Sequence, residues 1–209
     1  MESSKRLLSL DVFRGLTIAG MILVNTPGTW QYVYPPLQHA EWHGCTPTDW
    51  VFPFFLFIMG VAVPLALGKR IARGDDRQQI MLKILRRTLL IFGIGLFLNA
   101  FPKFDFATLR IPGVLQRIAL VYFFCSLIFV YIKTWRTQVW LSVGLLFLYW
   151  FLMAVVPVPD GNPPNLQPET NLGAWLDRQI LGTNHLWKQA VTWDPEGLLS
   201  TLPAIVTGM

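Results

Sequence analysis

Charged residues are scarce in this sequence. Only 14% of its 209 residues are Asp, Glu, Lys or Arg, while 53% are hydrophobic. Ordinary soluble domains carry about 25% charged and roughly 45–50% apolar residues. The apolar residues also form long blocks separated by short polar ones, which argues against a soluble fold. We predict a single membrane domain over residues 1–209.

Cysteines and nucleotide-binding motifs are also few or absent. The only two cysteines, Cys45 and Cys125, make neither a disulfide framework nor a metal-ligand spacing. The sequence has no Walker loop, no dinucleotide glycine fingerprint and no Gly-x-Ser-x-Gly elbow. The net charge is +5, but the basic residues lie between apolar blocks, so no nucleic-acid partner is expected.

Apolar stretches of spanning length predict an all-α, polytopic transmembrane helical bundle. They lie at about 8–26, 50–67, 88–101, 114–132 and 139–156, and a sixth begins at Gly197. From Gly197 to Met209 a helix would reach roughly 20 Å, short of a ~30 Å hydrocarbon core. We therefore expect about five full spans and the start of a sixth, truncated at the C-terminus, with the natural protein continuing past Met209.

Basic residues between the spans predict the orientation of the chain. They gather at 69–87, between the second and third spans, and at Lys133 and Arg136, between the fourth and fifth. Because basic loops favour the cytosolic side, we expect an integral membrane protein with a cytoplasmic N-terminus and lipid around it. Segments 27–49, 102–113 and 157–195 then lie on the opposite face, with Pro157–Pro168 as an extended linker.

The segment before the second span has the densest group of polar residues. His39 and His43 lie there with Glu41 and Asp49. A histidine can take a proton from an amine near neutral pH, and a carboxylate can orient its ring.

Two other interpretations of this segment remain open. Thr46 or Thr48 caps the helix, with Asp49 favouring its positive end. The zinc pair that His39 and His43 could form needs a helix, which Gly44 and Pro47 disfavour, so we expect no metal.

Three polar residues lie in or beside the first span. Asp11 and Arg14 are three apart on one helix face, and Asn25 lies near the outer end. Asp11 and Arg14 either pair to fix the helix or take part in function.

Further candidates lie at the later outer segments. Gln116 and Arg117 lie just inside the fourth span, where an arginine either seeks an anionic partner or extends to the membrane surface. Asp177 and Arg178 are predicted to be a solvated loop pair. Asp194 and Glu196 lie on either side of a proline, a pattern typical of the first turn of a helix. From this spacing alone we expect them to begin a helix.

Four ordered motifs resemble one known family. They are Ser9-Leu-Asp11-Val-Phe-Arg14-Gly15, the segment from Gln38 to Gly60 that contains His39-Ala-Glu-Trp42-His-Gly44 and Asp49, Arg110-Ile-Pro-Gly-Val-Leu-Gln-Arg117, and Asp194-Pro-Glu-Gly-Leu-Leu-Ser-Thr201. Together they resemble the catalytic region of the heparan-α-glucosaminide N-acetyltransferase family. The first motif is shared by broader membrane acyltransferase groups, whereas the ordered set is specific.

The resemblance implies an acetyl-CoA-dependent N-acetyltransferase. Acetyl would pass from cytosolic acetyl-CoA, the co-substrate, to the amine of a glucosamine-type sugar on the far side of a membrane, here a bacterial cell membrane. The family's active histidine falls on His39, with Asp49 and Asn25 as its polar partners. The substrate and CoA contacts fall on Gln116, Arg117, Asp11, Arg14, Asp194 and Glu196.

The expected partners are an amino sugar or another glycan acceptor, and we also consider a homodimer. A transporter or flippase for an acyl or sugar group is the alternative function, because polar helix ends and several glycines suit it too.

Overall fold

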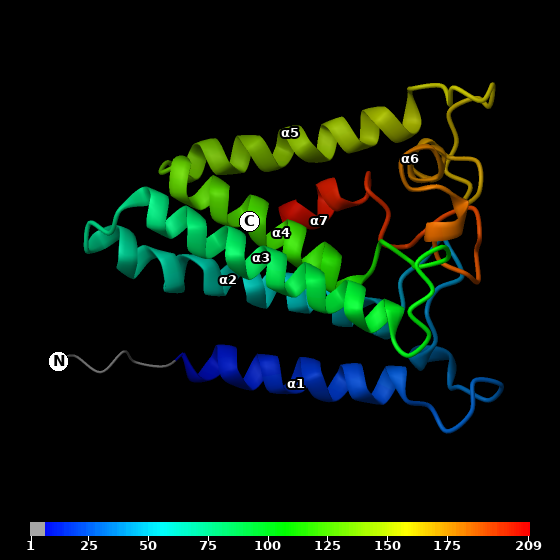
Figure 1. Cartoon of the computed structure of the whole chain (residues 1–209), viewed down its shortest axis with the longest axis horizontal. Coiled ribbons are helices and arrows are strands. Elements are labelled where there is room, and N and C mark those ends of the chain that lie inside the picture. Colours follow the sequence, from blue (N-terminus) through cyan, green and yellow to red (C-terminus); the bar gives the residue numbers. More distant parts are fainter. Residues whose placement is uncertain (1–6) are drawn as a thin grey trace. The chain divides into compact units, whose positions relative to one another are not determined.

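The computed structural model describes residues 7–209 as helices joined by turns, with no strand in that part of the chain (Figure 1). The chain forms two compact units, one running through Met59 and the other spanning Gly60–Met209. The all-helical class is therefore confirmed, while the predicted single domain stays a prediction.

The first unit contains α1 (Leu8–Asn25), the short 3-10 helices η1 (Pro35–Leu37) and η2 (Pro47–Trp50), and the start of α2 (Val51–Ala72). The ring of Phe13 on α1 packs edge-on against Phe54 of α2, with ring centroids 5.1 Å apart. Most side chains of α1 are exposed and apolar, as expected for a helix that faces lipid.

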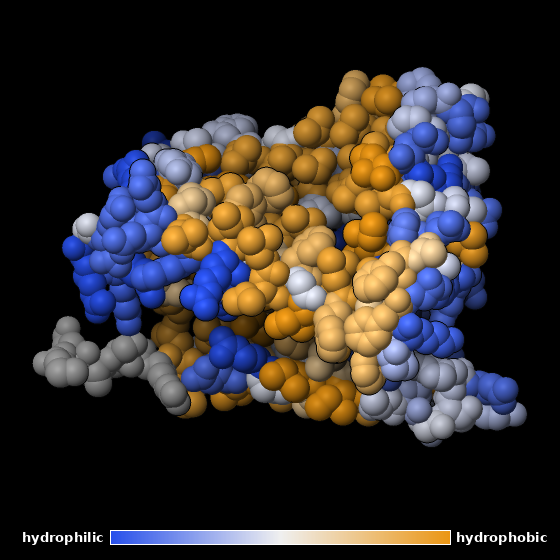
Figure 2. All heavy atoms as spheres, in the orientation of Figure 1, coloured by the Kyte–Doolittle hydropathy of each residue, from blue (hydrophilic) through white to orange (hydrophobic). Residues whose placement is uncertain are grey.

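The second unit contains the rest of α2 and the remaining helices. They are α3 (Arg77–Ala100), α4 (Val114–Tyr131), α5 (Trp135–Ala154), α6 (Leu172–Leu181), the 3-10 helix η3 (Thr183–His185) and α7 (Thr201–Thr207). Helix α3 packs along α4, and α7 packs against both α4 and α5 (Figure 1). In this unit apolar side chains cover the middle of the helices, between hydrophilic groups at the α2–α3 turn and around α6 (Figure 2).

Within residues 7–209, four helical stretches are long and apolar enough to cross a membrane, namely Leu8–Asn25, Pro47–Ala72, Val114–Tyr131 and Trp135–Ala154. Helix α3 is not among them, because every stretch of it as long as these includes Lys83, Arg86 and Arg87. Those three residues lie within the helix and not in the loop expected from sequence. Asp76 caps its N-terminus by accepting a hydrogen bond from the Gln78 N–H at 3.3 Å.

The part of the second unit that follows α5 differs from the sequence prediction. The segment after α5 carries the amphipathic helix α6, which the sequence analysis missed. Asn171 caps α6 by accepting a hydrogen bond from the Ala174 N–H at 2.9 Å, and Gly182, with φ +78°, ends it. Helix α7 begins at Thr201, so the sixth helix starts four residues later than the predicted Gly197.

Candidate active site

The start of α2 positions Asp49. Thr46 and Pro47 begin the 3-10 turn η2, and the Asp49 side chain folds back over that turn. Its Oδ2 accepts hydrogen bonds from the backbone N–H of Thr46 at 2.8 Å and of Ala40 at 3.2 Å. A carboxylate held by backbone donors has a defined orientation, which leaves Oδ1 directed at one remaining partner.

That partner is His39. Its Nδ1 lies 2.6 Å from Oδ1 of Asp49, although the two residues are ten apart in sequence. An ionised carboxylate only accepts hydrogen bonds, so Nδ1 carries a proton, and in the neutral ring Nε2 then keeps its lone pair. Nε2 has no hydrogen-bond partner among residues 7–209, and 66% of the His39 side chain is exposed. The arrangement is that of an oriented imidazole base.

The contacts that both interpretations of Asp49 require are present together. One carboxylate oxygen stabilises the helix start and the other orients His39. Residues 38–46 are not helical, so the helix that a zinc pair of His39 and His43 would require is absent from this segment.

The other candidates of the first unit lie on α1. The Asn25 side-chain amide donates to the backbone carbonyl of Met21 at 2.9 Å, and no hydrogen bond joins it to His39 or Asp49 within the described chain. Arg14 and Asp11 pair at 3.7 Å across one helix turn, and both side chains are about half exposed. Their pairing agrees with the structural interpretation of these two residues.

The second unit contains a separate cluster, the arginine–carboxylate cluster, which joins three segments distant in sequence. Arg110 donates from Nε to Asp194 Oδ2 at 2.8 Å and from one terminal nitrogen to Asp194 Oδ1 at 2.6 Å. The same nitrogen reaches Glu196 Oε2 at 2.5 Å. The Asp194 side chain is fully buried, and α7 begins at Thr201, so the prediction that Asp194 and Glu196 start a helix was wrong.

Arg117 and Gln116 of α4 are both buried, and Arg117 lies beside this cluster. One terminal nitrogen of Arg117 donates to the Gly197 carbonyl at 3.0 Å and to the Ser200 hydroxyl. Its Nε and the Gln116 Nε2 are buried without a hydrogen-bond partner among the described residues. Arg117 thus turns into the unit, and extension to the membrane surface does not occur.

Asp177 completes the cluster from α6. It is 2% exposed, and its Oδ1 accepts the Leu198 N–H at 2.8 Å. Burial raises the pKa of Asp177 to about 6. Burial likewise raises the pKa of Glu196, although Arg110 opposes that rise. The predicted solvated pair Asp177–Arg178 was wrong, because Arg178 instead binds the backbone carbonyls of Glu169 and Thr192.

Sequence reasoning missed Arg110 and Asp177 as members of this cluster. Arg110 is the first residue of one of the four family motifs, and its acidic partners Asp194 and Glu196 belong to another. Membership of these motifs was the signal that could have found Arg110. Asp177 had no such signal, because its burial depends on the helix α6.

The helices define a helical membrane protein, and the histidine–carboxylate pair is its candidate acid–base site. The comparisons identify the family. The family model "Heparan-alpha-glucosaminide N-acetyltransferase, catalytic" matches residues 6–176. Over 98% of its length the chain is 31% identical to the heparan-alpha-glucosaminide N-acetyltransferase of Mus musculus, and over 96% it is 32% identical to that of Homo sapiens. The chain belongs to the heparan-alpha-glucosaminide N-acetyltransferase family.

The chain spans just over a third of the length of these relatives, 38% of the mouse protein and 37% of the human one. The family model includes His39, Asp49 and Arg110, whereas Asp177, Asp194 and Glu196 lie beyond its match and within the part that the relatives cover.

Proposed function

We propose that this chain forms part of a membrane-embedded acetyltransferase that moves acetyl from cytosolic acetyl-CoA to the amine of a glucosamine-type sugar on the opposite face. Family membership supports the reaction class and the kind of acceptor. The single observation that carries the proposal is the contact of 2.6 Å between His39 Nδ1 and Asp49 Oδ1, which prepares Nε2 as a base.

The chemistry at Nε2 is a proton transfer coupled to acyl transfer. The amine nitrogen attacks the thioester carbonyl, a C–N bond forms, and Nε2 of His39 takes the amine proton. The C–S bond then breaks, and the proton passes from His39 to the departing thiolate of CoA. Asp49 stabilises the imidazolium while it exists.

The same nitrogen serves a second route, in which Nε2 itself attacks the thioester and carries the acetyl group before the amine takes it. In either route Asn25 is proposed to hold the carbonyl or the developing oxyanion. The side chains of Asp11, Arg14, Gln116, Arg117, Asp194 and Glu196 are proposed to position the donor and acceptor.

Sidedness is proposed from the basic residues. Lys69 and Arg70 lie in the last turn of α2, Lys133 lies in the α4–α5 turn, and Arg136 lies in the first turn of α5. Positive groups at these turns favour the cytosolic side, which holds the donor. Counting back from these turns places the N-terminus on the same side; Lys5 and Arg6, whose charge agrees with that assignment, lie outside the described residues.

The test uses the full-length parent protein, labelled acetyl-CoA and a panel of amino sugars. His39→Ala should abolish acetyl transfer and the release of free CoA thiol while membrane insertion is kept. His43→Ala, in the same exposed segment, is the matched control and should stay active. Full activity of His39→Ala would falsify the assignment of His39, and substrate flux without thiol release would favour a transporter instead.

A further inference from the structure

Helix α3 carries a group of cations on its exposed side, away from both polar sites described above. Lys83, Arg86 and Arg87 lie within little more than one helical turn, and all three residues are exposed. No ion pair joins this α3 cation cluster to a carboxylate within residues 7–209. The four long helices from α2 to α5 contain no Asp or Glu, so they supply no counter-ion.

Helix α4 shows how deep the cluster lies. The two helices pack antiparallel, because Gly95 lies against Leu115 at the start of α4 and the Arg87 guanidinium lies 4.9 Å from the centroid of the Tyr122 ring. Tyr122 is the ninth of the 18 residues of α4, a helix able to cross a membrane. The end of α4 at Tyr131 is about 13.5 Å further along the axis. An arginine side chain is shorter than that, so extension alone does not bring the Arg87 charge to water.

A cation exposed at this depth is costly unless an anion lies beside it. The Tyr122 ring offers a cation–π contact but no negative charge. The surface around the cluster is apolar, since Leu82, Leu85, Leu89 and Leu90 of α3 are each at least 41% exposed. Cations set among exposed leucines match an amphiphile that has an anionic head and an apolar tail.

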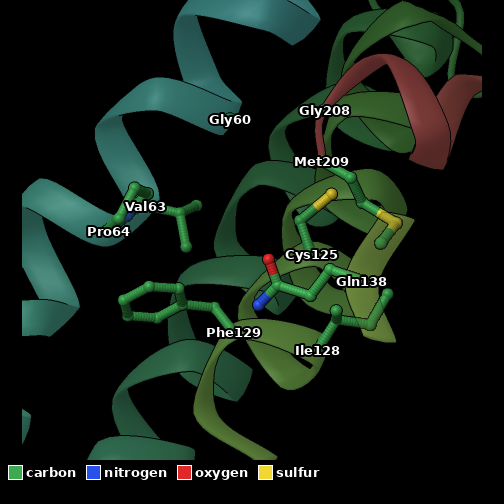
Figure 3. Close-up of a pocket in the computed structure, with 9 residues that line it drawn as sticks. All are labelled: Gly60, Val63, Pro64, Cys125, Ile128, Phe129, Gln138, Gly208 and Met209. Carbon is green, nitrogen blue, oxygen red and sulfur yellow. The ribbon is translucent and has the colours of Figure 1, made fainter. Parts of the chain in front are cut away.

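The internal cavities of the same unit do not offer this combination. The cavity among α2, α4, α5 and the end of α7 has Cys125 and Gln138 in its lining but no lysine or arginine (Figure 3). The cavity between α4 and α5, lined in part by Leu141 and Leu145, also lacks a cation. An anionic ligand of this unit therefore finds its partners on the exposed side of α3.

We infer that the α3 cation cluster and the leucines around it bind one anionic phospholipid of the leaflet beside the α2–α3 turn. Lys83 and Arg87 are four residues apart on one helix face, so both can reach a single phosphate, and a guanidinium binds two phosphate oxygens at once. The acyl chains cover Leu89 and Leu90. A soluble phosphate compound would leave these leucines uncovered, and a zwitterionic lipid brings its own cation to the phosphate.

The main experiment measures lipid binding to the delipidated full-length protein by native mass spectrometry. Phosphatidylglycerol should bind more tightly than phosphatidylcholine. Lys83→Gln/Arg87→Gln should weaken phosphatidylglycerol binding roughly tenfold or more and leave phosphatidylcholine binding unchanged, because two cations are lost. Lys133→Gln/Arg136→Gln removes the same two residue types near the α4–α5 turn. This matched control should leave both affinities unchanged.

A second measurement keeps all the cations in place. The photoreactive residue p-benzoylphenylalanine replaces Leu89, and the full-length protein is reconstituted in phosphatidylcholine vesicles that contain a minor fraction of phosphatidylglycerol. Crosslinking to phosphatidylglycerol should exceed the share of this lipid in the bilayer, and excess inorganic phosphate should not reduce it. The same replacement at Leu146, an exposed leucine of α5, is the control and should label the two lipids in proportion to their shares.

Neither measurement depends on acetyl transfer, so this inference and the proposed function can fail separately. Unchanged phosphatidylglycerol binding by folded Lys83→Gln/Arg87→Gln, or equal weakening by Lys133→Gln/Arg136→Gln, would overturn the lipid site. The inference would also fail if labelling from position 89 followed the bilayer composition, were suppressed by inorganic phosphate, or joined a second copy of the protein instead of a lipid.

Discussion

Arg110 and Asp194 are 84 residues apart in sequence, yet two nitrogens of the guanidinium bind the two oxygens of the carboxylate, at 2.8 and 2.6 Å. This contact ties the segment before α4 to the turn before α7. Alongside it, His185 Nδ1 meets the Leu109 carbonyl at 2.7 Å, and the Ile111 N–H donates to the His185 carbonyl at 2.9 Å. The segments before α4 and before α7 are therefore joined by polar contacts around Arg110 and its two carboxylate partners.

Replacing Arg110 by lysine keeps the charge and removes the paired donors. Because Asp194 is fully buried, we expect Arg110→Lys to reduce the free energy of unfolding by about 2–4 kcal/mol. Thermal unfolding of the purified protein measures the effect. Arg14→Lys, which alters an exposed pair at 3.7 Å, should cost less than about 1 kcal/mol. Equal effects of the two variants would show that the Arg110 pair has no special importance.

Gly197 is a second point of close packing. A Cβ atom there would fall on the Asp177 carboxylate, so Gly197→Ala should lower stability by about 1–3 kcal/mol. Gly28→Ala, where nothing lies within 4 Å of the added atom, should be neutral in the same unfolding measurement. The double variant Gly197→Ala/Asp177→Ala should recover part of the loss, and strictly additive losses would argue against the clash.

The contrast between the two polar sites explains what the sequence could predict. His39 and Asp49 lie in one short segment that precedes a helix, so residue types indicated a histidine–carboxylate site there, and the family resemblance paired His39 with Asp49. The arginine–carboxylate cluster depends on how α4, α6 and the turn before α7 pack, and no local pattern records that packing. Asp177 was assigned to solvent because α6 was not expected, and a short amphipathic helix within a polar segment gives a weak periodic signal.

The fold follows the same division. For α1, α2, α4 and α5, most of the predicted ends lie within a few residues of the observed ones. Long apolar blocks leave few alternatives for where a span begins and ends. Helix α3 was predicted too short, since its first half carries basic residues that were assigned to a loop. Charge alone does not end a helix, because lysine and arginine are good helix formers.

The buried carboxyl of Asp177 predicts a pH dependence of stability. Its folded-state pKa of about 6 lies above the unfolded value near 3.8, so the folded protein holds this proton more tightly. The resulting stabilisation is present below about pH 4 and is lost as the pH rises through 6. Above pH 7, Asp177→Asn should therefore increase the free energy of unfolding by on the order of 2 kcal/mol, which is measured as a higher melting temperature. Below pH 4 the variant should show no gain.

Asp105 provides the control for that experiment. It is exposed, and the Thr108 hydroxyl and the Ala107 N–H hold the pKa of Asp105 below its usual value. Asp105→Asn should not raise the melting temperature above pH 7. A pH-independent effect of Asp177→Asn would contradict the assignment of a buried titrating group.

Asp49→Asn separates the chemical role of Asp49 from its structural one. The carboxylate serves His39 with Oδ1 and the Thr46 and Ala40 N–H groups with Oδ2. An asparagine has one acceptor oxygen, so it can keep the backbone contacts or the contact to Nδ1, and its amide nitrogen would hold the imidazole in the wrong tautomer. We expect kcat for acetyl transfer to fall roughly 10²–10⁴-fold, with a smaller change in KM for acetyl-CoA.

The control for Asp49→Asn is Glu41→Gln, which neutralises an exposed carboxylate in the same segment and should retain full turnover. Thermal unfolding of both variants shows how much of any loss is structural. If Asp49→Asn lowers the melting temperature yet keeps the parent's kcat while His39→Ala is inactive, then Asp49 only stabilises the helix start. A fall in kcat at unchanged melting temperature instead assigns the carboxylate to orienting His39, because only the imidazole then depends on it.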